Sequence, residues 1–154
     1  MKRTILVFSA FLLVLPITSF AQLIDLSYNA NTGDAEFDLT LGNLNVEAKA
    51  DLDNFKADLS ISYEISQTKI EFLFDVVQME PVDVFMTLEL STLSNRPVEE
   101  VVEIYKVNRD KGWGYIAKEL DIKLGSEDFK SLKGRSSEKY KKARNRGKSK
   151  GQKK

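Results

Sequence analysis

The sequence has neither cysteine nor histidine among its 154 residues. Without cysteine, disulfides, thiolate metal sites and a lipid-modified cysteine anchor are excluded. Without histidine, the usual zinc ligands, Ser-His-Asp and Cys-His nucleophile systems and imidazole general bases are excluded as well. No phosphate-binding loop or dinucleotide fingerprint occurs. Catalysis would have to rest on carboxylates, lysine, tyrosine or serine. We predict a non-enzymatic protein with no catalytic, cofactor-binding or metal-binding residue.

The first 21 residues have the pattern of an export signal. Lys2 and Arg3 precede an apolar run from Thr4 to Leu15, and small residues at Ser19 and Ala21 precede the expected cleavage site. No other stretch approaches the roughly 20 apolar residues that a transmembrane helix needs. We therefore expect a signal peptide over 1–21, cleavage after Ala21, and a periplasmic or secreted protein with no transmembrane span.

The net charge of zero conceals a strong asymmetry between two parts of the chain. Residues 22–133 carry 11 Lys and Arg against 22 Asp and Glu, whereas residues 134–154 carry 10 Lys and Arg against Glu138 alone. The basic segment has few apolar side chains to offset a backbone ordering cost of about 1 to 2 kcal/mol per residue. The composition predicts a disordered basic tail over 134–154, following one acidic domain.

Apolar and polar residues alternate in the first part of that domain, as in Phe37, Leu39 and Leu41. Asn31 to Asp34 reads as a turn, and a two-residue turn at Gly42 and Asn43 accounts for a change of parity afterwards. The pattern predicts a three-stranded antiparallel β-meander over 22–50, with strands near 23–30, 35–41 and 44–50.

From Asp51 the apolar spacing becomes helical and continues to residue 133. Ser66 is predicted to cap one helix, and Pro81 and Pro97 are placed where helices begin. A last short helical turn is expected after Ser126. The predicted fold class is thus α+β and mostly α-helical, with five to six short helices over 51–133 packed on the meander as one unit.

Two segments, 59–73 and 116–132, both read as helix, tight turn and second helix. This order is typical of a helix-turn-helix, so nucleic-acid binding is one alternative function. However, paired helices are a common packing unit, and acidic residues in both second helices disfavour contact with phosphates. The acidic residues concerned are Glu71, Asp75, Glu127 and Asp128.

Carboxylates offer three further candidate sites. Glu80 and Asp83, with Asp75 nearby, could supply the acid and base of a hydrolase of envelope glycans, although acidic residues also favour a helix N-terminus electrostatically. Asp51 and Asp53 begin like a calcium loop but lack its later ligands, which favours a capping role. A shallow calcium site on the acidic face of the meander has no supporting spacing; its residues would be Asp25, Glu36, Asp38 and Glu47.

The basic tail is the clearest functional feature of the sequence. It could bind an anionic partner, such as lipid head groups, acidic polysaccharide or extracellular nucleic acid, or it could fold back on the acidic domain. Simple solvation is the third interpretation. The residues predicted to bind a partner are Arg135, Lys139, Lys141, Lys142, Arg144, Arg146, Lys148 and Lys150.

The run from Val101 to Gly134 contains Lys-Gly-Trp-Gly, then Ile-Ala-Lys-Glu-Leu and a Gly-Ser-x-x-Phe-x-x-Leu-Lys ending. It resembles the C-terminal helical module of a family of small exported bacterial proteins of unknown function. The resemblance implies kinship and export, but no activity. The chain departs from the family pattern at Asp121, Leu124 and Lys130, where glycine, proline and histidine are usual.

Trp113, the only tryptophan, lies between Gly112 and Gly114. As a core anchor it would fill the corner between two helices, whereas as an exposed platform it would bind a sugar ring or lipid. The first interpretation is favoured. Together these observations predict an exported interaction protein with a helical scaffold and a basic arm.

Overall fold

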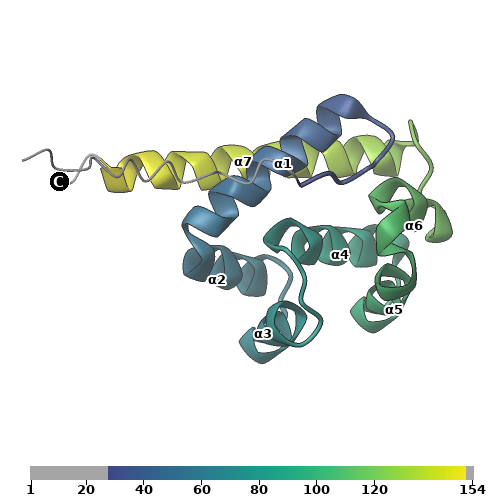
Figure 1. Cartoon of the computed structure of the whole chain (residues 1–154), viewed down its shortest axis with the longest axis horizontal. Coiled ribbons are helices and arrows are strands. Elements are labelled where there is room, and N and C mark those ends of the chain that lie inside the picture. The colour runs from purple at the N-terminus through teal and green to yellow at the C-terminus, as the bar shows by residue number, and fades with distance from the viewer. Residues whose placement is uncertain (1–27, 152–154) are drawn as a thin grey trace, which may run out of the picture.

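The computed structural model describes residues 28–151, with side chains described for residues 28–149. This part of the chain is entirely helical apart from turns (Figure 1). The predicted signal peptide, its cleavage site and the first predicted strand, up to residue 27, lie outside the described residues. The elements are α1 (Ala35–Ala50), α2 (Leu52–Ser62), α3 (Gln67–Asp75), α4 (Pro81–Ser94), α5 (Val98–Asn108), the 3₁₀ helix η1 (Arg109–Lys111), α6 (Trp113–Glu119) and α7 (Glu127–Gly151).

The prediction of a β-meander is wrong, because no strand occurs in the described residues and 35–50 form the single helix α1. Asp34 caps this helix by accepting a hydrogen bond from the Phe37 backbone N–H at 3.0 Å. Phe37 and Leu41 are buried, but Leu39 between them is 66% exposed. Burial at every third or fourth residue is helical, whereas a strand would have placed these three side chains on one face.

The helical domain predicted after Asp51 is present, and several predicted ends agree with the structure. Ser66 caps α3 through the Lys69 backbone N–H, and Pro81 occupies the first position of α4. Asn95, in the left-handed conformation, ends α4 before α5 begins.

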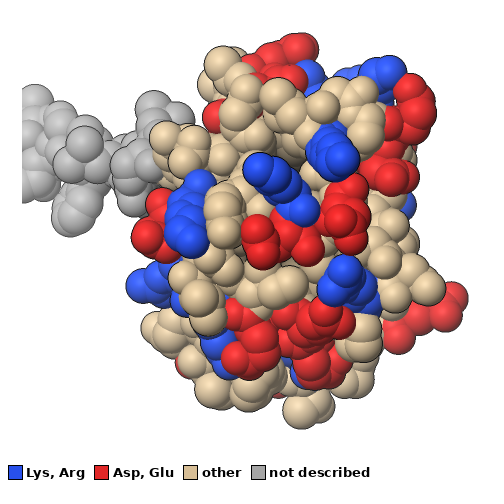
Figure 2. Space-filling model, turned by 90° about the vertical axis from the view of Figure 1, so that its right-hand side faces the viewer, with Lys and Arg blue, Asp and Glu red and all other residues tan. Residues whose placement is uncertain are grey.

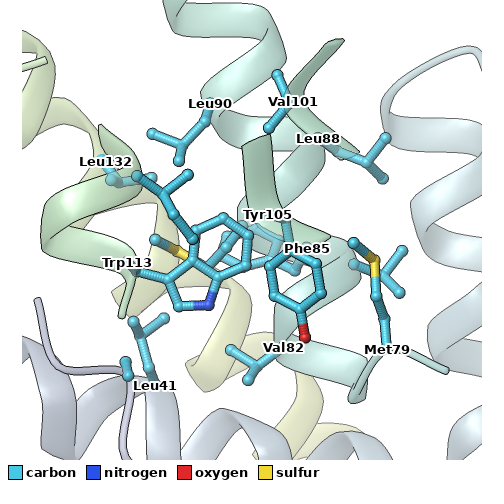
Figure 3. Close-up of a cluster of buried hydrophobic side chains, with 14 of the residues drawn as sticks. Leu41, Met79, Val82, Phe85, Leu88, Leu90, Val101, Tyr105, Trp113 and Leu132 are labelled. Carbon is cyan, nitrogen blue, oxygen red and sulfur yellow. The ribbon is translucent and has the colours of Figure 1, made fainter. Parts of the chain in front are cut away.

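Helix α4 is the centre of the molecule. Every residue from Pro81 to Leu90 is buried, and α1, α2, α3, α5 and α7 all contact this helix. In Figure 1, α7 crosses the domain above α4 with α1 beside it, and α5 and α6 lie at one end. Figure 3 shows the core around α4. Side chains of α4 (Val82, Phe85 and Leu88) lie among those of the surrounding helices, which include Leu41, Leu132 and the stacked rings of Tyr105 and Trp113.

The prediction of a disordered tail is also wrong for its described part, since 134–151 continue α7 without a break. The apolar row of Phe129 and Leu132 extends at helical spacing through Ser136, which is fully buried, to the partly buried Tyr140 and Ala143. Although few, these side chains lie on one face and pack against the domain, mainly along α1. Tertiary packing of that face stabilises a helix that composition alone disfavours.

Candidate functional site

The corner at Trp113 is held by the segment that precedes α1. The Ala30 carbonyl accepts the Trp113 backbone N–H at 2.8 Å, and the Asn31 carbonyl accepts that of Gly114 at 3.1 Å. A Cβ on Gly112 would lie 2.5 Å from the Asn31 Cβ, and one on Gly114 would lie 2.4 Å from the Thr32 carbonyl oxygen. The two glycines therefore let the segment pass closely over the corner.

Beneath this corner lies a buried carboxylate, Asp83. Tyr28 and Trp113 donate to its Oδ1 at 2.6 and 2.8 Å, and Tyr105 donates to its Oδ2 at 2.9 Å. Burial is the largest cause of the raised pKa of both tyrosine hydroxyls, and the adjacent Asp83 adds to it. The indole of Trp113 is 3% exposed, so it is a core side chain and not a surface platform.

The carboxylates considered for hydrolysis have structural roles here. Glu80 and Asp83 form the capping box that begins α4. The Glu80 carboxylate accepts the backbone N–H of Asp83, and the Asp83 carboxylate accepts the backbone N–H of Glu80. Asp83 is also saturated by the three side-chain donors at the corner. Asp75 is exposed at the end of α3.

Over residues 28–151, no group of three acidic side chains is close enough to hold a metal ion. Asp51 is the N-cap residue of α2, and Asp53 lies in the first turn of that helix. Glu36, Asp38 and Glu47, predicted on a sheet face, all belong to α1.

Four cations of the predicted tail form an inward row on α7, at positions 135, 139, 142 and 146. Lys139 and Lys142 bond the two oxygens of Asp58 at 2.8 and 2.5 Å, and Arg146 approaches the same carboxylate at 3.6 Å. Burial acts to raise the pKa of Asp58, but the hydrogen bonds from the two lysines outweigh it and hold that pKa below its usual value. The inward row therefore joins α7 to α2 with opposite charges.

The fourth cation, Arg135, pairs with Glu89 of α4, which is 3% exposed. The Nε of Arg135 lies 2.8 Å from Glu89 Oε2, and the Tyr63 hydroxyl donates to Oε1. Burial raises the pKa of Glu89, although the bond from Tyr63 and the charges of Arg135 and Lys139 oppose that rise. The pKa of the Lys139 ammonium is lowered, chiefly by burial, because its Nζ lies among the rings of Phe55, Tyr63 and Phe85.

Three other predicted cations lie on the opposite side of α7. Lys141, Arg144 and Lys148 are exposed, follow a spacing of three and four residues, and make no ion pair with any acid in the described part of the chain. We call them the outward stripe. Lys150 belongs to the same helix, but its side chain lies outside the described residues.

The end of the domain formed by α5 and α6 has mixed charge. Figure 2 views the end where α5 and α6 lie, and acidic and basic side chains are interspersed across it. Lys106, for example, pairs with Glu103 at 2.9 Å, and Arg96 with Glu100 at 2.6 Å. The outward stripe differs from this surface because α7 carries no acidic residue from 139 to 149, whereas acidic residues are interspersed with the cations of α5 and α6.

Sequence reasoning selected the cations of the tail but could not divide them into two faces. The division follows once α7 is a helix, since positions 139 and 141 are then about 200° apart around its axis. The acids Asp58 and Glu89 were missed. The sequence does place each acid next to a residue of the apolar row of a helix, Asp58 beside Leu59 and Glu89 beside Leu88. This position next to the buried face is the signal that could have identified them.

No helix among the described residues combines the length and the apolar character needed to cross a membrane. Comparison with known protein families, curated proteins and solved structures finds no match. The resemblance of residues 101–134 to a family of small exported proteins therefore stays a prediction.

Proposed function

We propose that the protein is an exported, non-enzymatic interaction protein that contacts an anionic partner through the outward stripe of α7. Export rests on the predicted signal peptide alone. The observation that carries the contact is the division of charge on α7, where the inward row is paired with Asp58 and Glu89 and the outward stripe makes no ion pair in the described part of the chain. Surplus cations on a rigid helix present fixed positive charge to a polyanion.

The spacing of the stripe fits a linear or planar array of negative groups. Lys141, Arg144 and Lys148 extend over two helical turns, about 10 Å along the axis. A lysine or arginine close to an anionic surface contributes about 1 kcal/mol to binding, so loss of all three should weaken binding about 100-fold. Lipid head groups, acidic polysaccharide and extracellular nucleic acid all satisfy this chemistry.

The test compares two variants with the same loss of charge. In Lys141→Gln/Arg144→Gln/Lys148→Gln the outward stripe is neutralised, and in Lys106→Gln/Lys118→Gln/Lys123→Gln three exposed lysines of the mixed-charge surface are neutralised. Binding is measured to heparin, to anionic vesicles and to duplex DNA at several salt concentrations. We expect only the stripe variant to lose binding and its salt dependence.

Equal losses in the two variants would show that net charge alone governs binding, and absence of binding to all three polyanions at low salt would reject the proposal. Deleting residues 134–154 is a poorer test. The deletion removes the partners of Asp58 and Glu89 together with the stripe, so that a folding defect and a binding defect would coincide.

A further inference from the structure

Helix α3 has an exposed surface on which acidic and apolar side chains lie in two adjacent rows. The acidic row is Glu71 and Asp75, the apolar row is Phe72 and Val76, and all four side chains are exposed. Residues four apart lie above one another on a helix, so each row runs along the helix axis. We call these four residues the α3 face.

The negative charge of the α3 face is not balanced within the described part of the chain. Lys69, the basic residue of α3, pairs with Glu99 of α5 at 2.6 Å, whereas Glu71 and Asp75 make no ion pair with any residue of 28–149. Exposed apolar side chains that adjoin charged ones are typical of surfaces that contact another protein. The α3 face therefore suits a partner that is basic and can also cover apolar surface.

The outward stripe of α7 has these properties. Arg144 and Lys148 are four residues apart, as are Glu71 and Asp75, so both pairs are separated by about 6 Å along their helix axes. An arginine side chain can stack on an aromatic ring, and the aliphatic stem of a lysine can cover apolar surface. The stripe thus complements both rows of the α3 face.

The stripe and the α3 face of one copy cannot meet, because α7 and α3 lie on opposite sides of α4 (Figure 1). Two α3 faces packed on each other would bring like charges together, which is unfavourable. The whole chain has 23 acidic and 23 basic residues, so no large net charge keeps two copies apart. We propose that the α3 face binds the outward stripe of a second copy of this chain.

Such a contact joins two different surfaces, so each bound copy retains one free stripe or one free α3 face. Copies therefore add to open chains or rings, and association does not stop at a symmetric dimer. The contact goes beyond the proposed function and rests on it only in using the same exposed stripe. A polyanion on the stripe should compete with the second copy.

Sedimentation velocity of the chain without its predicted signal peptide, over a series of concentrations at low salt, measures this association. The test variant Glu71→Gln/Asp75→Asn neutralises the acidic row. Its matched control, Asp110→Asn/Glu119→Gln, removes the same charge from exposed acids at the end formed by α5 and α6. We expect the wild type and the control to grow in mass with concentration and to dissociate in salt, and the test variant to associate about tenfold more weakly.

Charge reversal tests the pairing of the two surfaces. Glu71→Lys/Asp75→Lys reverses the acidic row, and Lys141→Glu/Arg144→Glu/Lys148→Glu reverses the stripe. Each variant alone should stay monomeric, because its own stripe and α3 face then carry charges of the same sign. A mixture of the two should associate again, because the reversed surfaces complement each other.

A wild type that stays monomeric at every concentration, an equal weakening in the control, or a mixture that does not associate would each overturn the proposal. The polyanion contact is tested separately, since the Glu71→Gln/Asp75→Asn variant keeps the stripe and should bind heparin as the wild type does. A wild type that binds heparin but never self-associates rejects this inference alone. One that self-associates but binds no polyanion rejects the proposed function alone.

Discussion

Replacing Asp58 by asparagine should release the C-terminal half of α7 from the domain. Asp58 accepts hydrogen bonds from Lys139 and Lys142, and its side chain is 14% exposed. The Lys139 side chain is 10% exposed, so without the carboxylate its ammonium would remain among three aromatic rings with no counterion of its own. The substitution therefore leaves a largely buried charge uncompensated.

The size of the effect follows from burial. Breaking a fully buried ion pair by removing one partner costs about 3 to 5 kcal/mol. Here Lys142 is 56% exposed and can turn to water, and the asparagine oxygen can still accept one bond from Lys139. We therefore expect Asp58→Asn to lower the free energy of unfolding by about 1.5 to 3 kcal/mol, the range for a hydrogen bond to a charged group.

Urea denaturation measures that loss, and hydrogen exchange locates it. Faster exchange is expected at the amides of 139–149, while the buried helix α4 changes only through the global loss of stability. Asp53→Asn, an exposed acid on the same helix, is the control and should cost less than about 1 kcal/mol. If the two variants lose equal stability and α7 exchanges alike in both, the docking argument is refuted.

Further substitutions test the corner, the tail helix and the buried pair. Gly114→Ala should cost about 1 to 3 kcal/mol in urea denaturation, because its Cβ meets backbone at 2.4 Å, whereas Gly134→Ala, with open space around its Cβ, should gain about 0.5 to 1 kcal/mol if the tail is helical. Trp113→Phe should cost about 1 to 3 kcal/mol by removing a donor from the buried Asp83 carboxylate. Folding raises the pKa of Glu89, so the protonated side chain contributes stability below pH ~4.3, and this contribution is lost as the pH rises through the raised pKa. Over that pH window the wild type should therefore lose stability relative to Glu89→Gln, as measured by denaturation at several pH values.

Much of the helical domain could be predicted because its ends carry local chemical markers. Ser66 offers a hydroxyl to a free N–H, and Pro81 lacks an N–H that the first turn of a helix would leave unpaired. Such effects involve neighbours in sequence, so a short stretch suffices to find them. The place of α4 at the centre, by contrast, depends on which helices surround it.

Residues 35–50 were predicted as strands because their apolar pattern fits both the two-residue period of a strand and the 3.6-residue period of a helix. Phe37, Leu39, Leu41 and Leu44 fit alternation with a turn, yet Phe37, Leu41 and Leu44 alone fit a helix. Only burial distinguishes the two, since Leu39 turns out to be exposed. Asp34 with acids in the following turn favours a helix start, and that marker competed with Gly42 and Asn43, which suggested a hairpin.

The tail was misjudged because composition counts apolar residues without their positions. Tyr140 and Ala143 are few, but they continue the row of Leu132, and Arg135 and Lys139 meet acids that lie on α4 and α2. The acidic partners are separated from the tail by about 45 to 80 residues of chain. The tail sequence on its own therefore shows only ten basic charges. The fold divides the described ones between a face of α7 that packs on the domain and a face that is exposed.

Both faces of α7 exist only if the basic segment is a helix docked on the domain. Carbon-13 chemical shifts of residues 134–149, with NOEs from the Lys139 side chain to the rings of Tyr63 and Phe85, test this directly. We predict helical shifts through Arg146 and observable NOEs to both rings. Random-coil shifts beyond Gly134, with no contact from Lys139 to either ring, would contradict the inward row and, with it, the outward stripe.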